Sequence, residues 1–241
     1  MSLIIRPSIP NNNRRQQCRW HSYSTTSAVE QAVVQAILDA AQLAINERNA
    51  FHLVLAGGTS PRHVYEILCS KITDWNAWHI YFGDERCLPN DHAERNSQMA
   101  AQAWLNHITI PASQIHIIPA EQGAENAAKI YAQILTKIEL FDLVLLGLGE
   151  DGHTASLFPG HDWGMTPDSP ATLAVNDAPK PPSQRVSLSA RRLSQTRKLM
   201  FLVTGAGKRQ VVKDWRNGAD IPAATISPDS GVDIYLEEAL L

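Results

Sequence analysis

The chain has 241 residues, 44% of them hydrophobic, with 21 Lys and Arg against 24 Asp and Glu, a formal net charge of −3. This length allows one large α/β domain or two small ones with a sizeable core. The slightly acidic balance argues against broad nucleic-acid or membrane-surface binding, so an anionic ligand must be bound by a local group of residues. Three widely spaced cysteines indicate no disulfide framework and fit a reducing compartment such as the cytoplasm.

The N-terminal residues 1–24 show no clear periodicity, and we expect poor order there, although Leu3-Ile4-Ile5 could begin a strand. This part contains no apolar core of signal-peptide length. No apolar run in the chain approaches the length of a membrane helix. We therefore expect a cytoplasmic protein with no membrane partner.

Strands and helices alternate through most of the chain. We predict helices over residues 27–48, 61–70, 96–107 and 122–140, and a further helix that follows residues 205–208 and ends at about residue 216. We predict strands over residues 51–56, 78–82, 115–118, 141–146, 172–176, 185–188, 198–204, 222–226 and 232–236. Ser27 with Glu30 has the spacing of a capping box, and Pro61 suits a first helical position. The alternation predicts one α/β domain over 1–241, with a mostly parallel sheet covered by helices on both faces. The proline-rich residues 158–183 are a candidate lid loop.

The first glycine-rich loop follows the strand 51–56 and reads Gly57-Gly58-Thr59-Ser60-Pro61. Paired glycines, two hydroxyls and a helix N-terminus favour phosphate or carboxylate binding, because free backbone N–H groups and the helix dipole attract anions. The alternative is a plain turn in which the hydroxyls cap the helix.

Charged residues follow the next strand, in Gly83-Asp84-Glu85-Arg86. The planar guanidinium of Arg86 could bind a phosphate or an anionic intermediate. An internal ion pair of Arg86 with Asp84 or Glu85 explains the same residues equally well. Lys208, near the start of the helix that ends at about Arg216, could likewise contact an anion or be an ordinary solvated lysine.

The loop after the strand 141–146 carries the strongest chemical signal. It contains three glycines, two acids and a histidine, in the order Gly147-Leu148-Gly149-Glu150-Asp151-Gly152-His153. Ligands bind at such strand ends in open α/β sheets, although the glycines could serve only the turn and His153 only the loop. The charges stand where a dinucleotide pyrophosphate would lie, so we expect no nicotinamide cofactor. The histidines have no metal-site spacing, so we expect no metal.

Several segments together resemble 6-phosphogluconolactonases of the type related to glucosamine-6-phosphate deaminase. They are residues 54–61, 80–86, 96–118, 141–159 and 179–188, and the most specific motif is GEDGHTASLFP at 149–159. The resemblance covers roughly residues 25–238. It implies a Rossmann-like fold and cofactor-free hydrolysis of 6-phospho-D-glucono-1,5-lactone to 6-phosphogluconate in the oxidative pentose phosphate pathway.

The resemblance also implies roles for individual residues. His153 matches the proposed general base and Asp151 its neighbouring acid, while Arg86 matches an arginine that faces the substrate. The residues expected to hold the phosphate are Gly57, Gly58, Thr59, Ser60, Arg185 and Lys208. The loop reads Gly-Gly-Thr-Ser-Pro where Gly-Gly-Ser-Thr-Pro is common, and Cys87 replaces a frequent aromatic residue.

Two other functions remain open at this point. An amino-sugar phosphate deaminase or isomerase would continue its Asp-Gly-His loop with Ile-Ala-Phe-Asn-Glu-Pro, whereas residues 154–159 read Thr-Ala-Ser-Leu-Phe-Pro. A non-catalytic sugar-phosphate sensor would lack the base or carry an added basic module. The expected partner is therefore a small phosphorylated sugar lactone, and the chain is expected to be a monomer or weak dimer.

Overall fold

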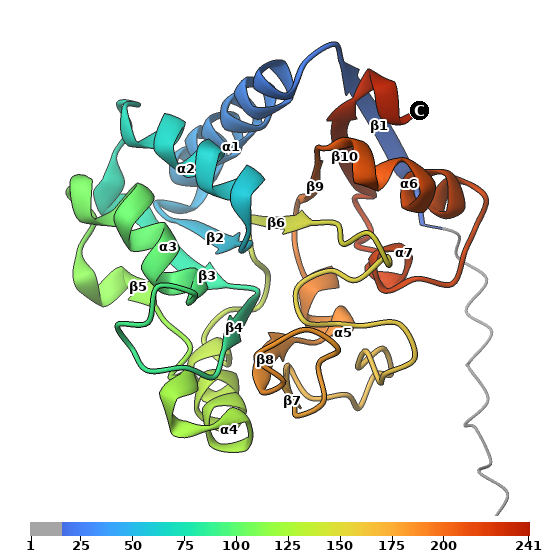
Figure 1. Ribbon diagram of the computed structural model, residues 1–241. Coiled ribbons are helices and arrows are strands. Elements are labelled where there is room, and N and C mark those ends of the chain that lie inside the picture. Colours follow the sequence, from blue (N-terminus) through green and yellow to red (C-terminus); the bar gives the residue numbers. More distant parts are fainter. Residues whose placement is uncertain (1–15) are drawn as a thin grey trace, which may run out of the picture.

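A computed structural model describes residues 16–241, which form a seven-stranded and a three-stranded sheet with helices around them (Figure 1). The large sheet comprises β1 (Cys18–Tyr23), β2 (Phe51–Leu55), β3 (Trp78–Phe82), β5 (Ile115–His116), β6 (Leu143–Gly147), β9 (Leu199–Val203) and β10 (Val232–Glu237). The small sheet comprises β4 (Asp84–Arg86), β7 (Thr172–Val175) and β8 (Arg185–Leu188). The helices are α1 (Thr26–Arg48), α2 (Thr59–Cys69), α3 (Asn96–Ala103), α4 (Ala124–Leu135), α5 (Ala190–Ser194), α6 (Arg209–Arg216) and α7 (Pro222–Thr225). Short 3-10 turns are η1 (Trp75–Ala77), η2 (Leu105–His107), η3 (Ala112–Gln114), η4 (Ala120–Gln122), η5 (Ala206–Lys208) and η6 (Glu238–Leu240).

The large sheet is parallel throughout, in the order β1-β10-β9-β6-β2-β3-β5. From β2 the chain continues outward through β3 to β5, and it then returns to β6 and continues the other way through β9 and β10. The order therefore reverses between β2 and β6. In open parallel sheets this reversal leaves a crevice at the carboxyl ends of the strands, where ligands bind. The two glycine-rich loops singled out in the sequence are the ones that follow β2 and β6.

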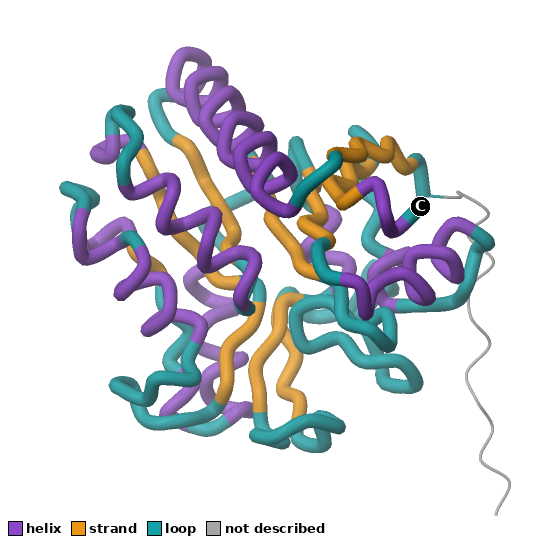
Figure 2. Tube along the Cα trace, turned by 45° about the horizontal axis from the view of Figure 1, so that its top comes forward, coloured by secondary structure: helices purple, strands orange, loops and turns teal. Residues whose placement is uncertain are grey.

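Helices cover both faces of the large sheet (Figure 2), as the sequence predicted. Side chains alternate between faces along a strand, so Trp78 and Tyr81 of β3 lie on opposite faces. Trp78 packs edge-on against Trp104, which follows α3, at 5.8 Å between ring centroids. On the other face, the ring of Tyr81 lies 5.3 Å from that of Phe141, and Arg192 of α5 covers Phe141 at 4.1 Å.

Helix α1 begins one residue earlier than predicted. Its N-cap is Thr25, whose side chain accepts a hydrogen bond from the N–H of Ala28, so the predicted capping box of Ser27 and Glu30 is wrong. Glu30 is instead buried and pairs with His63 of α2 at 3.0 Å. By length and composition alone, this 23-residue helix could cross a membrane, which the sequence analysis did not expect. Its buried residues pack on the sheet and α2, as in the core helix of a folded domain.

Three other predictions need correction. Residues 222–226 are not a strand, because Pro222–Thr225 forms the short helix α7, with the proline at its first turn. Helix α2 begins at Thr59, so Pro61 is its third residue and not its first. The N-terminal region is ordered over Cys18–Tyr23, where β1 pairs with β10, and the suggested strand at Leu3-Ile4-Ile5 lies outside the described residues.

The small sheet is antiparallel, in the order β4-β8-β7, and it departs from the parallel pattern expected from the alternation. Strand β4 follows β3 directly after Gly83. Arg185 and Arg86 are opposite each other in the pairing of β8 with β4. The small sheet thus brings Asp84–Arg86 beside a segment about 100 residues further along the chain.

Candidate active site

A cleft of about 380 Å³ opens at the carboxyl ends of β2 and β6. Six of the predicted site residues line it: Gly57, Gly58, Arg86, His153, Arg185 and Lys208. The remaining lining residues are Ala56, Asp84, Asn96, Gly147, Leu148, Gly149, Glu150, Thr154, Ala155 and Lys180. Asp151, Thr59 and Ser60 do not line the cleft but lie directly beside residues that do. The fold therefore brings the predicted residues together at the reversal of strand order (Figure 1).

The imidazole of His153 is held by Asp151. Its Nδ1 makes a short hydrogen bond to Asp151 Oδ1, which also accepts from the backbone N–H of His153 at 3.2 Å. Nε2 is then the ring nitrogen with no hydrogen-bond partner among residues 16–241. Gly149 makes this arrangement possible, because a Cβ there would lie 2.0 Å from His153 Nδ1. The glycine thus serves close approach of the imidazole to the backbone and not only the turn.

Electrostatics favour the neutral imidazole at this position. Burial lowers the pKa of His153 below 6.5, and the ammonium of Lys180 lowers it further, while Asp151 and Asp84 act in the opposite direction. Burial would raise the pKa of Asp151, but its hydrogen bond and attraction to His153 outweigh that effect and lower the pKa overall. The pair at neutral pH is thus a carboxylate and a neutral histidine, the combination that a general base requires.

Arg185 is 5% exposed, and its guanidinium mainly supports the chain around Lys180. Nε donates to the carbonyl of Pro182 at 3.1 Å, and Nη2 donates to the carbonyl of Lys180 at 2.9 Å. Phe158 lies between this guanidinium, at 5.5 Å, and the ring of His153, at 5.0 Å. Arg185 therefore fixes the loop that carries Lys180 as well as contributing positive charge to the cleft.

Lys180 is a cleft residue that the sequence analysis missed. Its charge lowers the pKa of both His153 and Lys208, and all three residues line the same cleft. The feature of the sequence that could have indicated Lys180 is its position in the stiff segment Ala178-Pro179-Lys180-Pro181-Pro182, five residues before Arg185. Burial and Lys180 together lower the pKa of Lys208, whereas Glu150 and Asp151 raise it. Two neighbouring ammonium groups, with few acids paired to them, are suited to a doubly charged anion.

The suggested ion pair of Arg86 with Asp84 or Glu85 does not form. Arg86 Nη1 donates to the carbonyl of Glu94 at 2.5 Å. Glu85 is buried, and it accepts hydrogen bonds from the backbone N–H groups of Asn96 and Ser97 at 2.7 and 2.9 Å. The sequence could not distinguish these partners, because they come from the loop and helix that follow β4.

The loop after β2 approaches the cleft with its backbone. A Cβ on Gly57 would lie 2.0 Å from Asn96 Oδ1, and Gly58 has φ = +108°, so both positions need glycine. The loop leads into the N-terminus of α2, where the first N–H groups have no intrahelical partner. Ser60 Oγ is hydrogen-bonded to Thr204 Oγ1 at 2.5 Å, which joins this helix start to the end of β9. The hydroxyl of Ser60 thus has a structural partner, whereas the backbone N–H groups remain for an anion.

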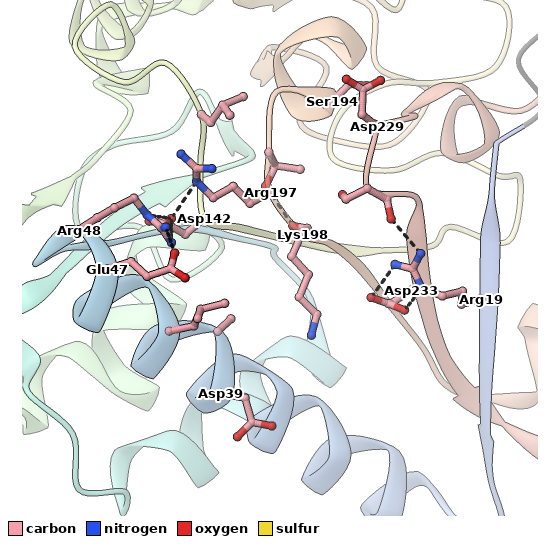
Figure 3. Close-up of a pocket in the computed structure, with 15 residues that line it drawn as sticks. Arg19, Asp39, Glu47, Arg48, Asp142, Ser194, Arg197, Lys198, Asp229 and Asp233 are labelled. Atoms are coloured by element: carbon pink, nitrogen blue, oxygen red, sulfur yellow. Dashed lines mark hydrogen bonds and ion pairs between the residues drawn. The ribbon is translucent and has the colours of Figure 1, made fainter.

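A larger cleft, of about 770 Å³, lies near the amino ends of β6, β9 and β10 (Figure 3). Four of its charged groups form ion pairs: Arg48 contacts Asp142 at 3.0 Å, and Arg19 contacts Asp233 at 2.7 Å. These pairs tie the end of α1 and strand β1 to the amino ends of β6 and β10. The smaller cleft is the better candidate site, since its positive groups are concentrated around a histidine and backbone glycines.

Comparison with known proteins identifies the family of this chain. The sequence profile of the family described as glucosamine-6-phosphate isomerases/6-phosphogluconolactonase matches residues 24–235. The 6-phosphogluconolactonase of Mycobacterium tuberculosis is 34% identical over 210 residues, covering 80% of this chain and 85% of the relative. A rice protein named probable 6-phosphogluconolactonase 3, chloroplastic, is 34% identical over 211 residues, 78% of this chain. The chain spans 64% of the length of that rice relative.

Solved structures show the same architecture. A 6-phosphogluconolactonase from Thermotoga maritima superposes with a TM-score of 0.83 at 25% identity, over 91% of this chain and all of the other. A monomeric glucosamine-6-phosphate deaminase has a TM-score of 0.77 at 18% identity and shares the fold, over 93% of this chain and 98% of the other. The Rossmann-like α/β fold expected from the sequence is therefore confirmed. With the profile matching nearly the whole described chain, the protein belongs to the glucosamine-6-phosphate isomerase/6-phosphogluconolactonase family.

Proposed function

We propose that this protein hydrolyses 6-phospho-D-glucono-1,5-lactone to 6-phospho-D-gluconate, a step of the oxidative pentose phosphate pathway. The observation that carries the proposal is the pair of Asp151 and neutral His153 in a cleft whose other side is positively charged. A lactone is an activated ester, so its hydrolysis needs a base for water and a donor for the developing oxyanion. The names of the relatives support the same reaction.

In the proposed reaction, Nε2 of His153 takes a proton from water as the water oxygen bonds to C1 of the lactone. Asp151 holds the ring through Nδ1 and stabilises the imidazolium that forms. The tetrahedral intermediate then breaks its bond between C1 and the ring oxygen, and the imidazolium returns the proton to that oxygen. A positioned base contributes roughly 10²–10⁴-fold to such a step.

Arg86 is the proposed donor to the oxyanion. The alternative donors, backbone N–H groups of the loop after β6, are largely engaged within the loop itself. Gly149 donates to the carbonyl of His153 at 2.7 Å, and Gly152 donates to the carbonyl of Gly149 at 3.1 Å. Arg86 uses Nη1 for the carbonyl of Glu94 and keeps its other donors for the cleft. One such donor contributes about 3–4 kcal/mol to the transition state.

The phosphate is proposed to lie against the N-terminus of α2, between Lys180 and Lys208. Gly57 and Gly58 present backbone there, and Arg185 holds Lys180 in place. These groups do not touch the reacting carbon, so their contribution is orientation and remote binding energy. Thr59 and Ser60 contribute through their backbone N–H groups at the helix start.

The absence of a cofactor, the monomeric or weakly dimeric state and the cytoplasmic location stay predictions. A deaminase would share the fold, but this chain lacks the deaminase Glu in its Thr154–Pro159 segment. A sensor would bind the lactone without turnover.

A coupled assay tests the reaction directly. Glucose-6-phosphate dehydrogenase supplies the lactone, and 6-phosphogluconate dehydrogenase reports the open acid. We expect the protein to accelerate product formation well above the spontaneous rate. Binding without acceleration would support the sensor instead, and release of ammonia from glucosamine 6-phosphate would support the deaminase.

A further inference from the structure

Asp84 is a second carboxylate of the cleft, and the proposed reaction leaves it without a role. It lines the cleft although the residue is only 6% exposed. Ser156 Oγ donates to its Oδ2 at 2.6 Å, and Asn96 Nδ2 donates to its Oδ1 at 3.0 Å. The carboxylate is therefore fixed in one orientation by two neutral donors, and it forms no direct ion pair with a residue of the described range 16–241.

The hydrogen bonds of Asp84 place it on the same side of the cleft as the histidine. Ser156 belongs to the loop of His153, three residues further along, and its N–H donates to Ser187 Oγ of β8 at 3.2 Å. Asp84 begins β4, which pairs with β8. Its negative charge raises the pKa of both His153 and Arg185, as expected for a carboxylate close to each. The Asp84 carboxylate is thus a rigid hydrogen-bond acceptor in the part of the cleft that holds His153.

The chemistry of this acceptor limits what can lie against it. A carboxylate accepts hydrogen bonds and repels a phosphate, which the ammonium groups of Lys180 and Lys208 attract to the other part of the cleft. A sugar lactone carries hydroxyl groups, which are donors, on the carbons that follow its carbonyl. With the carbonyl carbon in reach of His153, the nearest of these is the hydroxyl on the adjacent carbon.

We infer that Asp84 accepts a hydrogen bond from the hydroxyl next to the lactone carbonyl and makes the enzyme selective for lactones that carry it. This inference rests on the proposed function. A buried acceptor left unpaired by a substrate without the hydroxyl would be costly, and a site built to bind a hydroxyl discriminates strongly against its absence. The expected preference is on the order of 10–100-fold in kcat/KM, the range of a hydrogen bond to a charged group.

The test compares two preformed lactones, those of 6-phosphogluconate and of its 2-deoxy analogue, by the acid that their hydrolysis releases. The ratio of kcat/KM for the first lactone to kcat/KM for the second is expected to be about 10 or more in the wild type. Asp84→Asn is expected to reduce this ratio to near one. Glu150→Gln is the matched control, because Glu150 is another acid of the cleft and its removal should leave the ratio as it is. An unchanged ratio in Asp84→Asn, or no preference in the wild type, would overturn the inference.

Ser156→Ala keeps the carboxylate and removes one of its two fixed donors, so it serves if Asp84→Asn does not fold. A ratio that falls several-fold in this variant supports the inference, and a ratio equal to that of the wild type contradicts it. Hydrolysis of the first lactone by the wild type separates this result from the proposed function. If neither lactone is hydrolysed faster than spontaneously, the proposed function itself fails, and the inference with it.

Discussion

His153 donates its Nδ1–H to the carboxylate of Asp151, two residues earlier in the loop that follows β6. The side chain of His153 is 21% exposed and that of Asp151 is 38% exposed, so the acid is the more solvent-exposed member of the pair. Burial lowers the pKa of His153 and favours the neutral imidazole, while the hydrogen bond and attraction to His153 lower the pKa of Asp151 and keep it ionised. The local geometry therefore supplies a base that needs no further activation.

Removal of the base is the first prediction. His153→Ala is expected to lower kcat by at least about 10²-fold, because no other group would take the proton from water. His161→Ala is the matched control, since His161 also packs against Phe158, at 5.9 Å, but does not line the cleft. Steady-state rates in the coupled assay check both variants. A folded His153→Ala protein with near-normal kcat would show that another group is the base.

The pH dependence follows from the lowered pKa of His153. Activity requires the neutral imidazole, so kcat/KM should hold its plateau below pH 6.5 and decline only as the pH falls through the lowered pKa. In Asp151→Asn the attraction that raises the pKa is lost, so the decline should move to still lower pH and the plateau of kcat should drop by roughly 10-fold or more. Profiles of kcat/KM from about pH 5 to 8 measure both effects. A shift of the Asp151→Asn decline to higher pH would contradict this electrostatic account.

The proposed phosphate site predicts an effect confined to phosphorylated substrate. Lys180→Ala and Arg185→Ala are each expected to raise KM for the phosphorylated lactone by about 10-fold or more, since remote binding energy is lost. Hydrolysis of D-glucono-1,5-lactone, which has no phosphate, should barely change. Lys137→Ala, at the other edge of the sheet, is the control for a general loss of positive charge. Equal losses on the two lactones would reject a role in phosphate binding.

Gly149 is predicted to be needed for the position of the imidazole. Gly149→Ala would place a Cβ 2.0 Å from His153 Nδ1, and the ring must move away from Asp151, so kcat should fall by about 10-fold or more. Gly147→Ala in the same loop meets nothing within 4 Å and should lose less kcat. Equal kcat in the two variants would mean that the ring tolerates the displacement.

A ladder of imidazole rings across β2, β3 and β5 predicts acid sensitivity. His52 stacks on His79 at 4.7 Å between centroids, and His79 stacks on His116 at 5.8 Å. Burial lowers the pKa of all three, that of His52 to about 4, and the ring of His79 also disfavours a charge on His52 and on His116. The cations Arg48 and Lys137 act in the same direction, while Asp142 opposes them at His52.

The sign of the stability change follows from these lowered pKa values. The unfolded chain binds protons near pH 6.5 and the folded chain only at lower pH, so stability is complete above pH 6.5 and is lost as the pH falls toward about 4. His79→Phe keeps a ring in the ladder and should shrink the drop in Tm between about pH 7 and 4.5 by roughly 2–4 °C. His107→Gln, on the exposed surface, should leave the drop unchanged. A drop in Tm that His79→Phe does not reduce would contradict the account.

Local patterns predicted most elements because the signals lie within a few residues. Strand β3 begins and ends as predicted, and β2, β9 and β10 do so within one residue, since each is a short apolar run bounded by turns. The prediction failed at Pro222–Thr225, because four residues are too few to show helical periodicity. It also misplaced the cap of α1, where several residues in a row, Thr25 to Ser27, all suit the position.

The α/β class, the family and the loop that carries His153 and Asp151 could be predicted from the sequence, because each single strand, helix and motif is a pattern of residues close together in the chain. The partners of Asp84 could not be predicted from the sequence, because its hydrogen bond with Ser156 joins residues 72 positions apart. For the same reason, only the tertiary structure shows that Lys180 and His153 line one cleft and that the strand order reverses between β2 and β6. Hydrogen bonds and charge interactions of this kind depend on distance in space, and a chain that folds back on itself sets that distance independently of sequence separation.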